Sequence, residues 1–224
     1  MDIYIVRTSI LKSLTQSLHC LKGELLDIGC GKMPYRDYIL NNSAVEKYIG
    51  LDIQNALKYD QNVTPDFTWD GKKMPFDKET FDCAFGTEVL EHCPEPEVVL
   101  NETWRVLKPG GTFFFTVPFL WNLHEVPHDE YRYTPFSMKR HLINTGFTNI
   151  QIHALGGWHL AMAQMIGLWL KRSPISRVNS IQKRLLSKFL MAFMKKLIRI
   201  GEKEKVHFTE GQMITGLYGL AVKP

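Results

Sequence analysis

The feature that most restricts the fold of this chain is a repeated alternation of short apolar runs with amphipathic helical segments. Helical periodicity is clearest in "PEPEVVLNETWRVLKPGG", which Pro109 and Gly110 are expected to end, and in a segment that begins at Thr134, has Pro135 in its first turn and ends near Gly146. Strands that alternate with helices form a parallel sheet with helices on both faces, so the sequence predicts an α/β fold. The predicted strands are the apolar or β-branched runs at residues 25–26, 47–53, 66–69, 81–86, 111–117, 148–156 and 215–224.

The composition fits a globular protein of the cytoplasm. The chain has 224 residues and 45% hydrophobic content, enough for one α/β domain with an elaboration. No secretory signal is expected, and the longest apolar run, residues 160–170, is shorter than the roughly 20 residues that span a bilayer. The cysteines have no C-x-x-C spacing and favour a reducing compartment; they are Cys20, Cys30, Cys83 and Cys93.

The turn after the first predicted strand, "LLDIGCGKMPY", is the most specific site signal. Gly29 and Gly31 let the backbone approach a ligand at the carboxyl end of the sheet, but Pro34 occupies the last glycine position of the G-x-G-x-x-G motif of nicotinamide sites. Asp52 ends the second strand, where an acid can accept hydrogen bonds from both hydroxyls of a ribose, and Asp70 follows the third strand near the expected adenine. The alternative is that both acids are strand-end turn residues.

Together with "YIGLDI", "WDGKKMPFDKETFD" and "GTEVLEHCPEPEVVLNETWRVLKPGGTFFFTVP", this turn resembles the successive motifs of class I S-adenosylmethionine-dependent methyltransferases of the type 11 group. The resemblance covers residues 25–118 and implies a Rossmann-like seven-stranded sheet, mostly parallel with an antiparallel last strand. It departs from the family at Met33, which stands where a third glycine is common. The cofactor-binding residues that it implies are Asp27, Gly29, Cys30, Gly31, Asp52, Ile53, Asp70, Gly71, Thr87 and Glu88.

The stretch "HEVPHDEYRYTP" begins with H-E-x-x-H, the pattern of zinc proteases, which needs His124 and His128 one helical turn apart. Pro127 lies between them, lacks an N–H and pushes Val126 toward extended geometry. We therefore expect a loop and no metal. Because it follows the fifth strand, this loop should overhang the cofactor pocket.

A methyl transfer to a hydroxyl needs a base, and histidine has a suitable pKa. The catalytic candidates are His128, which we expect to face the acceptor, and His92, while His124 should mainly pack. The stretch from His128 onward is also similar to the "H-D-x-Y-R-Y-T" of methyltransferases from glycan-synthesis clusters. The acceptor-wall candidates are therefore His124, Tyr131, Arg132 and Tyr133, with loop packing, including an Arg132 pair with Asp129 or Glu130, as the alternative.

A helical insert is expected between the last two strands, which divides the chain into a methyltransferase core at residues 1–157, an insert or lid at 158–210 and the last core strand at 211–224. Within the insert, Ser173 and Pro174 would begin a long helix and Gly201 would end it. Residues 171–205 carry eleven Lys or Arg and two acids, a net charge of +9 in a chain whose total is +4, so the rest is acidic. The helix has one apolar stripe, Val178, Ile181, Leu185, Phe189, Phe193 and Leu197, and one basic stripe, Arg177, Arg184, Lys188, Lys195 and Arg199. It would act as a lid or as a peripheral contact with an anionic membrane.

The sequence thus predicts an S-adenosylmethionine-dependent methyltransferase that acts on a hydroxyl of a small molecule or glycan, with a lipid-linked acceptor as one form. The alternatives are a quinone-type or lipid carbon methyltransferase and, in another class, a non-catalytic nucleoside-binding module. Nucleic acid is not expected as a partner, because "GTEVLEHCP" lacks the N/D-P-P-Y motif of base-amine methylation and Cys93-Pro94 reverses the Pro-Cys motif used on pyrimidine carbon.

Overall fold

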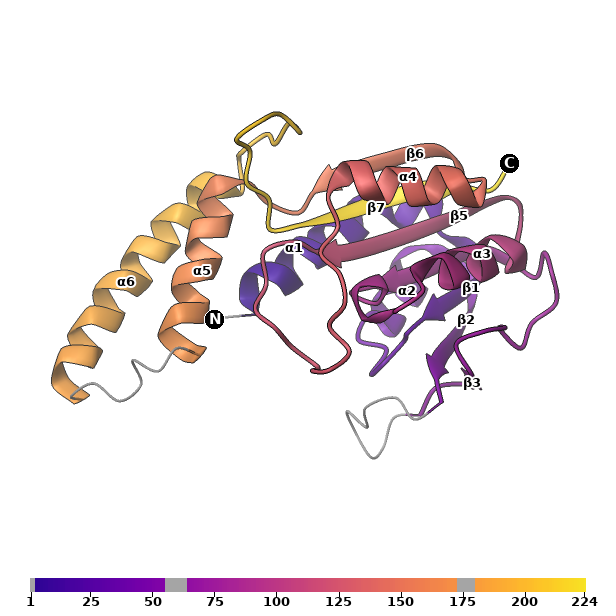
Figure 1. Ribbon diagram of the computed structural model, residues 1–224, viewed down its shortest axis with the longest axis horizontal. Helices are drawn as coiled ribbons and strands as arrows, with labels where there is room; N and C mark the ends of the chain where they lie inside the picture. Colours follow the sequence, from indigo (N-terminus) through magenta and orange to yellow (C-terminus); the bar gives the residue numbers. More distant parts are fainter. Residues whose placement is uncertain (1–2, 55–63, 173–179) are drawn as a thin grey trace.

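A computed structural model describes residues 3–54, 64–172 and 180–224 of the chain. Its centre is one seven-stranded sheet with the order β3-β2-β1-β4-β5-β7-β6 (Figure 1). The pairs among the first five strands are parallel, whereas β7 runs antiparallel to both β5 and β6. This arrangement confirms the predicted α/β fold and its antiparallel last strand. The strands are β1 Lys22–Ile28, β2 Ala44–Ile53, β3 Phe67–Trp69, β4 Phe81–Thr87, β5 Leu107–Pro118, β6 Thr148–Ala154 and β7 Gly216–Val222.

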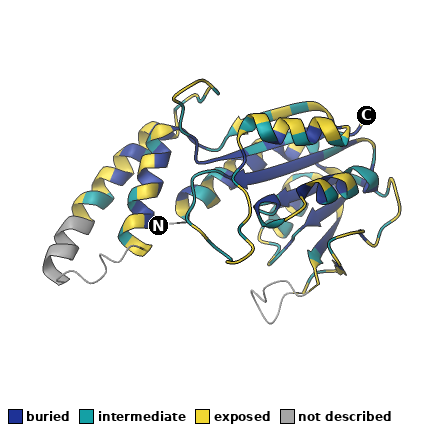
Figure 2. Cartoon of the chain, viewed as in Figure 1, coloured by how far each residue is buried: buried dark blue, intermediate teal, exposed yellow. Residues whose placement is uncertain are grey.

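Helices cover both faces of the sheet because successive strand residues point to opposite sides. Leu25 of β1 and Phe114 of β5 pack in one buried cluster with helices α1 (Tyr4–Ser17) and α2 (Arg36–Asn42). Their neighbours Leu26 and Phe113 pack in a second cluster with α3 (Pro96–Val106) and α4 (Pro135–Thr145). The central strands β1, β4 and β5 are therefore buried on both sides over most of their length, whereas the edge strands β3 and β6 are largely exposed or half-buried (Figure 2). Two short 3-10 helices, η1 Leu18–Cys20 and η2 Leu90–His92, complete this core.

Two helices were predicted with their ends, α3 and α4. Both ends of α4 are confirmed: Thr134 and Ser137 form a reciprocal capping box at its start, and Gly146, at φ 101°, ends it. Helix α3 ends at Val106, earlier than expected, because Leu107 already begins β5 and Pro109 lies within that strand.

The insert between β6 and β7 forms two helices that lie side by side beyond the end of the sheet, α5 (Trp158–Arg172) and α6 (Ser180–Gly201) (Figure 1). Ile5 of α1 packs against Leu160 and Ala163 of α5 and Leu197 of α6, which attaches the pair to the core. The predicted start at Ser173 and Pro174 lies outside the described residues.

The apolar stripe of α6 is only partly covered. Leu197 is buried, but Phe189 is 70% exposed and Phe193 is 43% exposed. The basic residues Lys188 and Lys195 are exposed on the same helix. No helix among the described residues is long and apolar enough to cross a membrane.

Candidate active site

The carboxyl ends of β1, β2, β4 and β5 lie at one edge of the sheet, since these strands are parallel neighbours. The loops that leave this edge carry the residues singled out from the sequence. In open α/β sheets, ligands bind at this edge.

The glycine turn after β1 is a tight structure. Gly29 has φ +63°, and a Cβ there would lie 2.7 Å from a methyl group of Val89, so the close approach that Gly29 permits is to the loop after β4. Met33 also adopts a positive φ, 49°, and its N–H donates to the carbonyl of Cys30 at 2.7 Å. Met33 thus takes the left-handed conformation that a third glycine would provide.

The carboxylate of Asp52 is held at the end of β2 by two backbone donors. The Gly31 N–H donates to Oδ2 at 3.0 Å and the Ile53 N–H donates to Oδ1 at 2.8 Å. Burial raises the pKa of Asp52. Each oxygen keeps a lone pair for one more donor, so the oriented carboxylate fits the two adjacent hydroxyls of a ribose. Ile53 is 48% exposed beside it.

Asp27 and Cys30 lie beneath the turn. Both are buried. The Tyr48 hydroxyl donates to the Asp27 carboxyl, while burial raises the pKa of Asp27 to about 8. The Cys30 N–H donates to the carbonyl of Leu51 at 3.1 Å. These contacts assign both residues a supporting position under the glycine turn; direct cofactor contact stays a prediction.

The Asp70 carboxylate closes a turn, as in the alternative derived from the sequence. Its Oδ1 accepts the N–H groups of Lys72 at 2.9 Å and Lys73 at 3.2 Å, and these bonds lower the pKa of Asp70. Gly71, at φ +81°, lies next to the side chain of Ile53. Contact of Asp70 with an adenine stays a prediction.

Thr87 ends β4, and Glu88 follows it with φ 54°. The Glu88 N–H donates to the Thr116 carbonyl at 3.1 Å, and the Thr116 hydroxyl donates to Glu88 Oε1 at 2.8 Å. Burial raises the pKa of Glu88 to about 7. The carboxyl is therefore fixed at the inner end of the site.

The segment between Trp121 and Thr134, after β5, contains no helix, so the predicted loop is confirmed. The two histidines separate: His124 is partly buried beside His92, with ring centroids 4.7 Å apart, whereas His128 is exposed. The His124 backbone is held there because its N–H donates to Asp129 Oδ2 at 3.1 Å. The expectation that His128 faces the acceptor stays a prediction.

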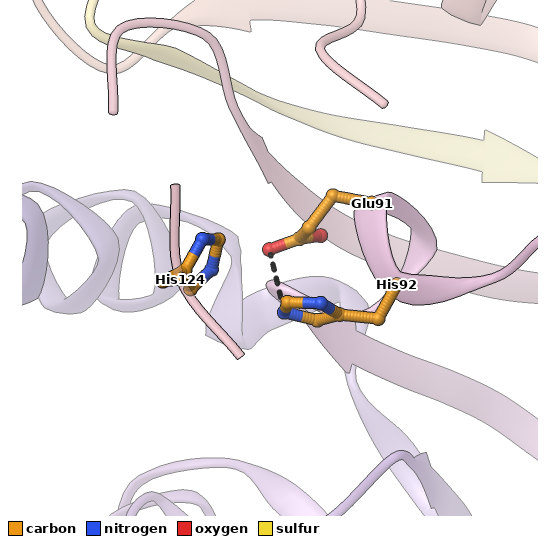
Figure 3. Close-up of side chains that lie close together, drawn as sticks. All are labelled: Glu91, His92 and His124. Carbon is orange, nitrogen blue, oxygen red and sulfur yellow. Dashed lines mark ion pairs between the residues drawn. The ribbon is translucent and has the colours of Figure 1, made fainter. Parts of the chain in front are cut away.

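Glu91, His92 and His124 form a compact group in which each offers one potential metal-ligand atom within 4.8 Å of the others (Figure 3). Glu91 is fully buried, and neither of its carboxylate oxygens has a hydrogen-bond partner among the described residues. His92 Nε2 lies 3.7 Å from Glu91 Oε1 and 3.6 Å from Glu125 Oε2. We call Glu91, His92 and His124 the histidine–glutamate cluster. Sequence reasoning does not single out Glu91, because nothing in "EHCP" reveals that the two loops meet.

The rest of the loop packs against itself and against η2. Arg132 makes a bidentate pair with Asp129, at 2.7 and 2.8 Å, as the packing alternative foresaw. The Tyr131 hydroxyl donates to the Pro94 carbonyl and that of Tyr133 to the Leu90 carbonyl. Tyr133 is only 3% exposed and its ring packs in the core, so contact of Tyr133 with an acceptor stays a prediction.

A small hollow adjoins Glu88 on the side of the helical insert. Two buried polar atoms in its lining, Gln164 Oε1 and Thr215 Oγ1, have no hydrogen-bond partner among the described residues. Its lining is mostly apolar and consists of Val6, Glu88, Pro118, Leu120, Trp121, Leu155, Gln164, Thr215 and Gly216.

The chain is similar in sequence and fold to known methyltransferases. Residues 26–115 match the family model described as a methyltransferase domain. The chain is 38% identical over 104 residues to the sterol 24-C-methyltransferase of Saccharomyces cerevisiae, covering 41% of this chain and 27% of that protein. It is 31% identical over 98 residues to the fatty-acid O-methyltransferase of Mycolicibacterium smegmatis, covering 41% of this chain and 36% of that protein. The solved structure of a SAM-dependent methyltransferase from Archaeoglobus fulgidus has a TM-score of 0.59 at 14% identity, over 98% of this chain and 94% of that one.

The fold and the strand-end site define a Rossmann-like protein of the kind that binds a nucleoside at the carboxyl edge of its sheet. Residues 26–115 match a methyltransferase domain, and the seven-stranded sheet has the fold of solved S-adenosylmethionine-dependent methyltransferases. The matched stretches span only 27% to 36% of the curated relatives' own length.

Proposed function

We propose that the chain transfers a methyl group from S-adenosylmethionine to an oxygen atom, foremost a hydroxyl, of a small and largely apolar molecule. One observation carries the proposal: the Asp52 carboxylate, which fits the hydroxyls of a ribose, and the histidine–glutamate cluster lie at the same edge of the sheet. Glu125 connects them, since its carboxylate is 3.6 Å from His92 Nε2 and its charge helps to raise the pKa of Asp52.

The residues at the tips of β1 and β2 fit the cofactor. Asp52 would accept the ribose hydroxyls, the glycine turn at Gly29 and Gly31 would border the methionine part, and Ile53 would contact the adenine beside Asp70. When bound, S-adenosylmethionine supplies a methyl group on a positively charged sulfur. The remaining task of the protein is to hold the acceptor in line with it and to exclude water.

An acceptor hydroxyl must also lose its proton or have its developing negative charge stabilised. The histidine–glutamate cluster is suited to this task because its residues come from the loops after β4 and β5, at the same edge of the sheet as the glycine turn. His92 is oriented by the carbonyl of His128, which is 2.7 Å from its Nδ1. This bond turns Nε2 toward Glu91 and Glu125.

The names of the relatives support an apolar acceptor, since they specify sterols and a fatty acid. The hollow next to Glu88 has room for only about one water molecule, so it does not identify the acceptor.

A second candidate is methylation at carbon of an apolar alkene. The observation in its favour is that the sterol relative is a C-methyltransferase by name. A glycan carried on a lipid would be a further oxygen acceptor, and a non-catalytic nucleoside-binding module would use only Asp52 and the glycine turn.

The test is a reaction with methyl-labelled S-adenosylmethionine and a panel of sterols, fatty acids, polyprenols, lipid-linked glycans and free glycans, followed by mass analysis. We expect label in a lipid fraction that is released by ester hydrolysis or ether cleavage. Label that resists both treatments would mean that the methyl group is attached to carbon and not to oxygen. Label only in free glycans would overturn the apolar acceptor, and cofactor binding without transfer to any fraction would favour the binding module.

A further inference from the structure

The histidine–glutamate cluster has the ligand set of a metal site. Two imidazoles and one carboxylate converge from two separate loops, with His124 arriving from the side opposite His92 (Figure 3). The 3.7 Å between His92 Nε2 and Glu91 Oε1 is close to the roughly 3.3 Å that separates two ligand atoms around a tetrahedral zinc ion. Only a small side-chain adjustment would bring the third ligand to the same point.

His92 has the outer hydrogen-bond partner that metal-bound histidines usually have. Its Nδ1 is 2.7 Å from the backbone carbonyl of His128. An oxygen partner on Nδ1 fixes the tautomer and leaves Nε2 as the atom that binds a metal. His124 Nδ1 lies 3.3 Å from Asp129 Oδ2 and makes no hydrogen bond among the described residues, and the Asp129 carboxylate is itself fixed by Arg132.

Glu91 lacks the polar partner that a buried carboxyl group normally has. It is fully buried, and neither of its oxygens has a hydrogen-bond donor in the described part of the chain. Burying a carboxyl group without such a partner costs free energy. A divalent cation would provide the partner. Glu88, Glu125 and Asp129 carry further carboxyl groups close to the cluster, and the Arg132 guanidinium pairs with Asp129.

We propose that Glu91, His92 and His124 bind one divalent transition-metal ion of the type that prefers imidazole and carboxylate ligands, such as zinc. The site differs from the H-E-x-x-H motif in its ligands, since it uses His124 but replaces His128 by His92 from the loop after β4. Three protein ligands leave at least one coordination position open. If the proposed function holds, that position would receive the acceptor oxygen.

The experiment measures metal binding directly, without an acceptor. The full chain is stripped of metal with a chelator, dialysed and titrated calorimetrically with zinc, cobalt(II) and magnesium, and cobalt binding is also followed by visible absorption. We expect one zinc or cobalt ion per chain and no binding of magnesium. Binding of less than one equivalent, or equal binding of magnesium, would overturn the proposal.

Variants assign the ligands. Glu91→Gln keeps the shape of the side chain, and His124→Ala removes one imidazole; each should weaken zinc binding by about 100-fold or more, because loss of an outer partner alone costs 10 to 100-fold. His128→Ala is the matched control, because it deletes an exposed imidazole but keeps the carbonyl that orients His92, so zinc affinity should not change. Loss of binding in His128→Ala, or full binding in Glu91→Gln, would contradict the ligand assignment. Circular dichroism of each metal-stripped variant reports folding, and if His124→Ala does not fold, Glu91→Gln decides.

The zinc titration tests the metal site and the methyl-transfer assay tests the proposed function, so the two proposals can fail separately. Methyl transfer that persists in the metal-stripped chain, together with stoichiometric zinc binding, would leave the site standing without a role in transfer. If the chain binds no zinc but still transfers methyl groups, the proposed metal site is refuted and the proposed methyltransferase function stands.

Discussion

The backbone N–H of Gly31 donates a hydrogen bond of 3.0 Å to Oδ2 of Asp52 and thereby joins the tips of β1 and β2. The bond orients the carboxylate before any ligand arrives. We expect Asp52→Ala to weaken S-adenosylmethionine binding by about tenfold or more, because an unpaired buried polar group costs on the order of 1 to 3 kcal/mol. Calorimetric titration measures the affinity. Glu46→Ala, an exposed acid elsewhere on β2, is the control, and an unchanged affinity in Asp52→Ala would remove Asp52 from the ribose site.

Gly29 and Gly110 both have a positive φ, but only Gly29 is crowded by a neighbouring side chain. Comparing substitutions at the two positions therefore separates the effect of crowding from that of backbone strain. A side chain at Gly29 would meet Val89 at 2.7 Å, whereas one at Gly110 would meet nothing within 4 Å. Gly110→Ala should cost about 1 to 2 kcal/mol of unfolding free energy from the left-handed conformation alone. Gly29→Ala should cost more and should also weaken cofactor binding. Urea denaturation of both variants checks this, and equal losses would mean that Val89 can move aside.

The buried pair of Asp27 and Tyr48 makes a prediction about pH. The pKa of Asp27 is raised from 3.8 to about 8, so the folded state holds a proton that the unfolded state releases over this interval. This contribution to stability is fully present below about pH 4 and is lost as the pH rises to about 8, by up to roughly 1.4 kcal/mol per pH unit. Asp27→Asn keeps an acceptor for Tyr48 and removes the charge. Thermal unfolding between pH 5 and 9 should therefore show a flatter profile for Asp27→Asn than for the wild type; parallel profiles would argue against a protonated Asp27.

The positions of the two loop histidines predict unequal effects on turnover. His124 lies against His92, and His128 is exposed. Removing a group that activates the acceptor typically lowers the rate by 10² to 10⁴-fold, so we expect a loss of about this size for His124→Ala and a smaller one for His128→Ala. Steady-state kinetics with an identified acceptor decides. A larger loss in His128→Ala would restore the order expected from the sequence.

The exposed face of α6 predicts contact with an anionic membrane. Phe189 is 70% exposed beside Lys188, and Lys195 is exposed further along the helix. Each basic residue near such a surface contributes about 1 kcal/mol, so reversing Lys188 and Lys195 to Glu should lower binding to anionic lipid vesicles by roughly 30-fold or more. Reversal of Lys139 and Arg140, which are exposed on α4, is the control. If the wild type does not sediment with these vesicles, the insert acts as a lid without membrane contact.

The fold was predictable because its signals are local. Gly146 and Pro135 mark the ends of α4, and the apolar runs mark the strands. The end of α3 was less predictable, because hydrogen bonding between β4 and β5 draws Leu107 into the sheet despite its helical spacing.

The site was predictable only where a residue is tied to a strand end. Asp52 follows from its place on β2, and the position of Met33 follows from the glycine pattern, although its left-handed conformation does not. Glu91 and His124 come from loops more than thirty residues apart, and their meeting depends on how the second loop folds back. No periodicity in the sequence records such a contact.

The position of β7 has a consequence for the synthesis of the protein. In the described sheet, β6 pairs with β7 alone, and β7 follows it in the chain. During translation, β6 leaves the ribosome first and has no strand partner until residues 155–215 and then β7 have been made. At 5 to 20 residues per second, this delay is roughly 3 to 14 seconds. During that interval the edges of β5 and β6 are open to other chains, so the length of the insert between β6 and β7 sets how soon the growing chain can close its own sheet.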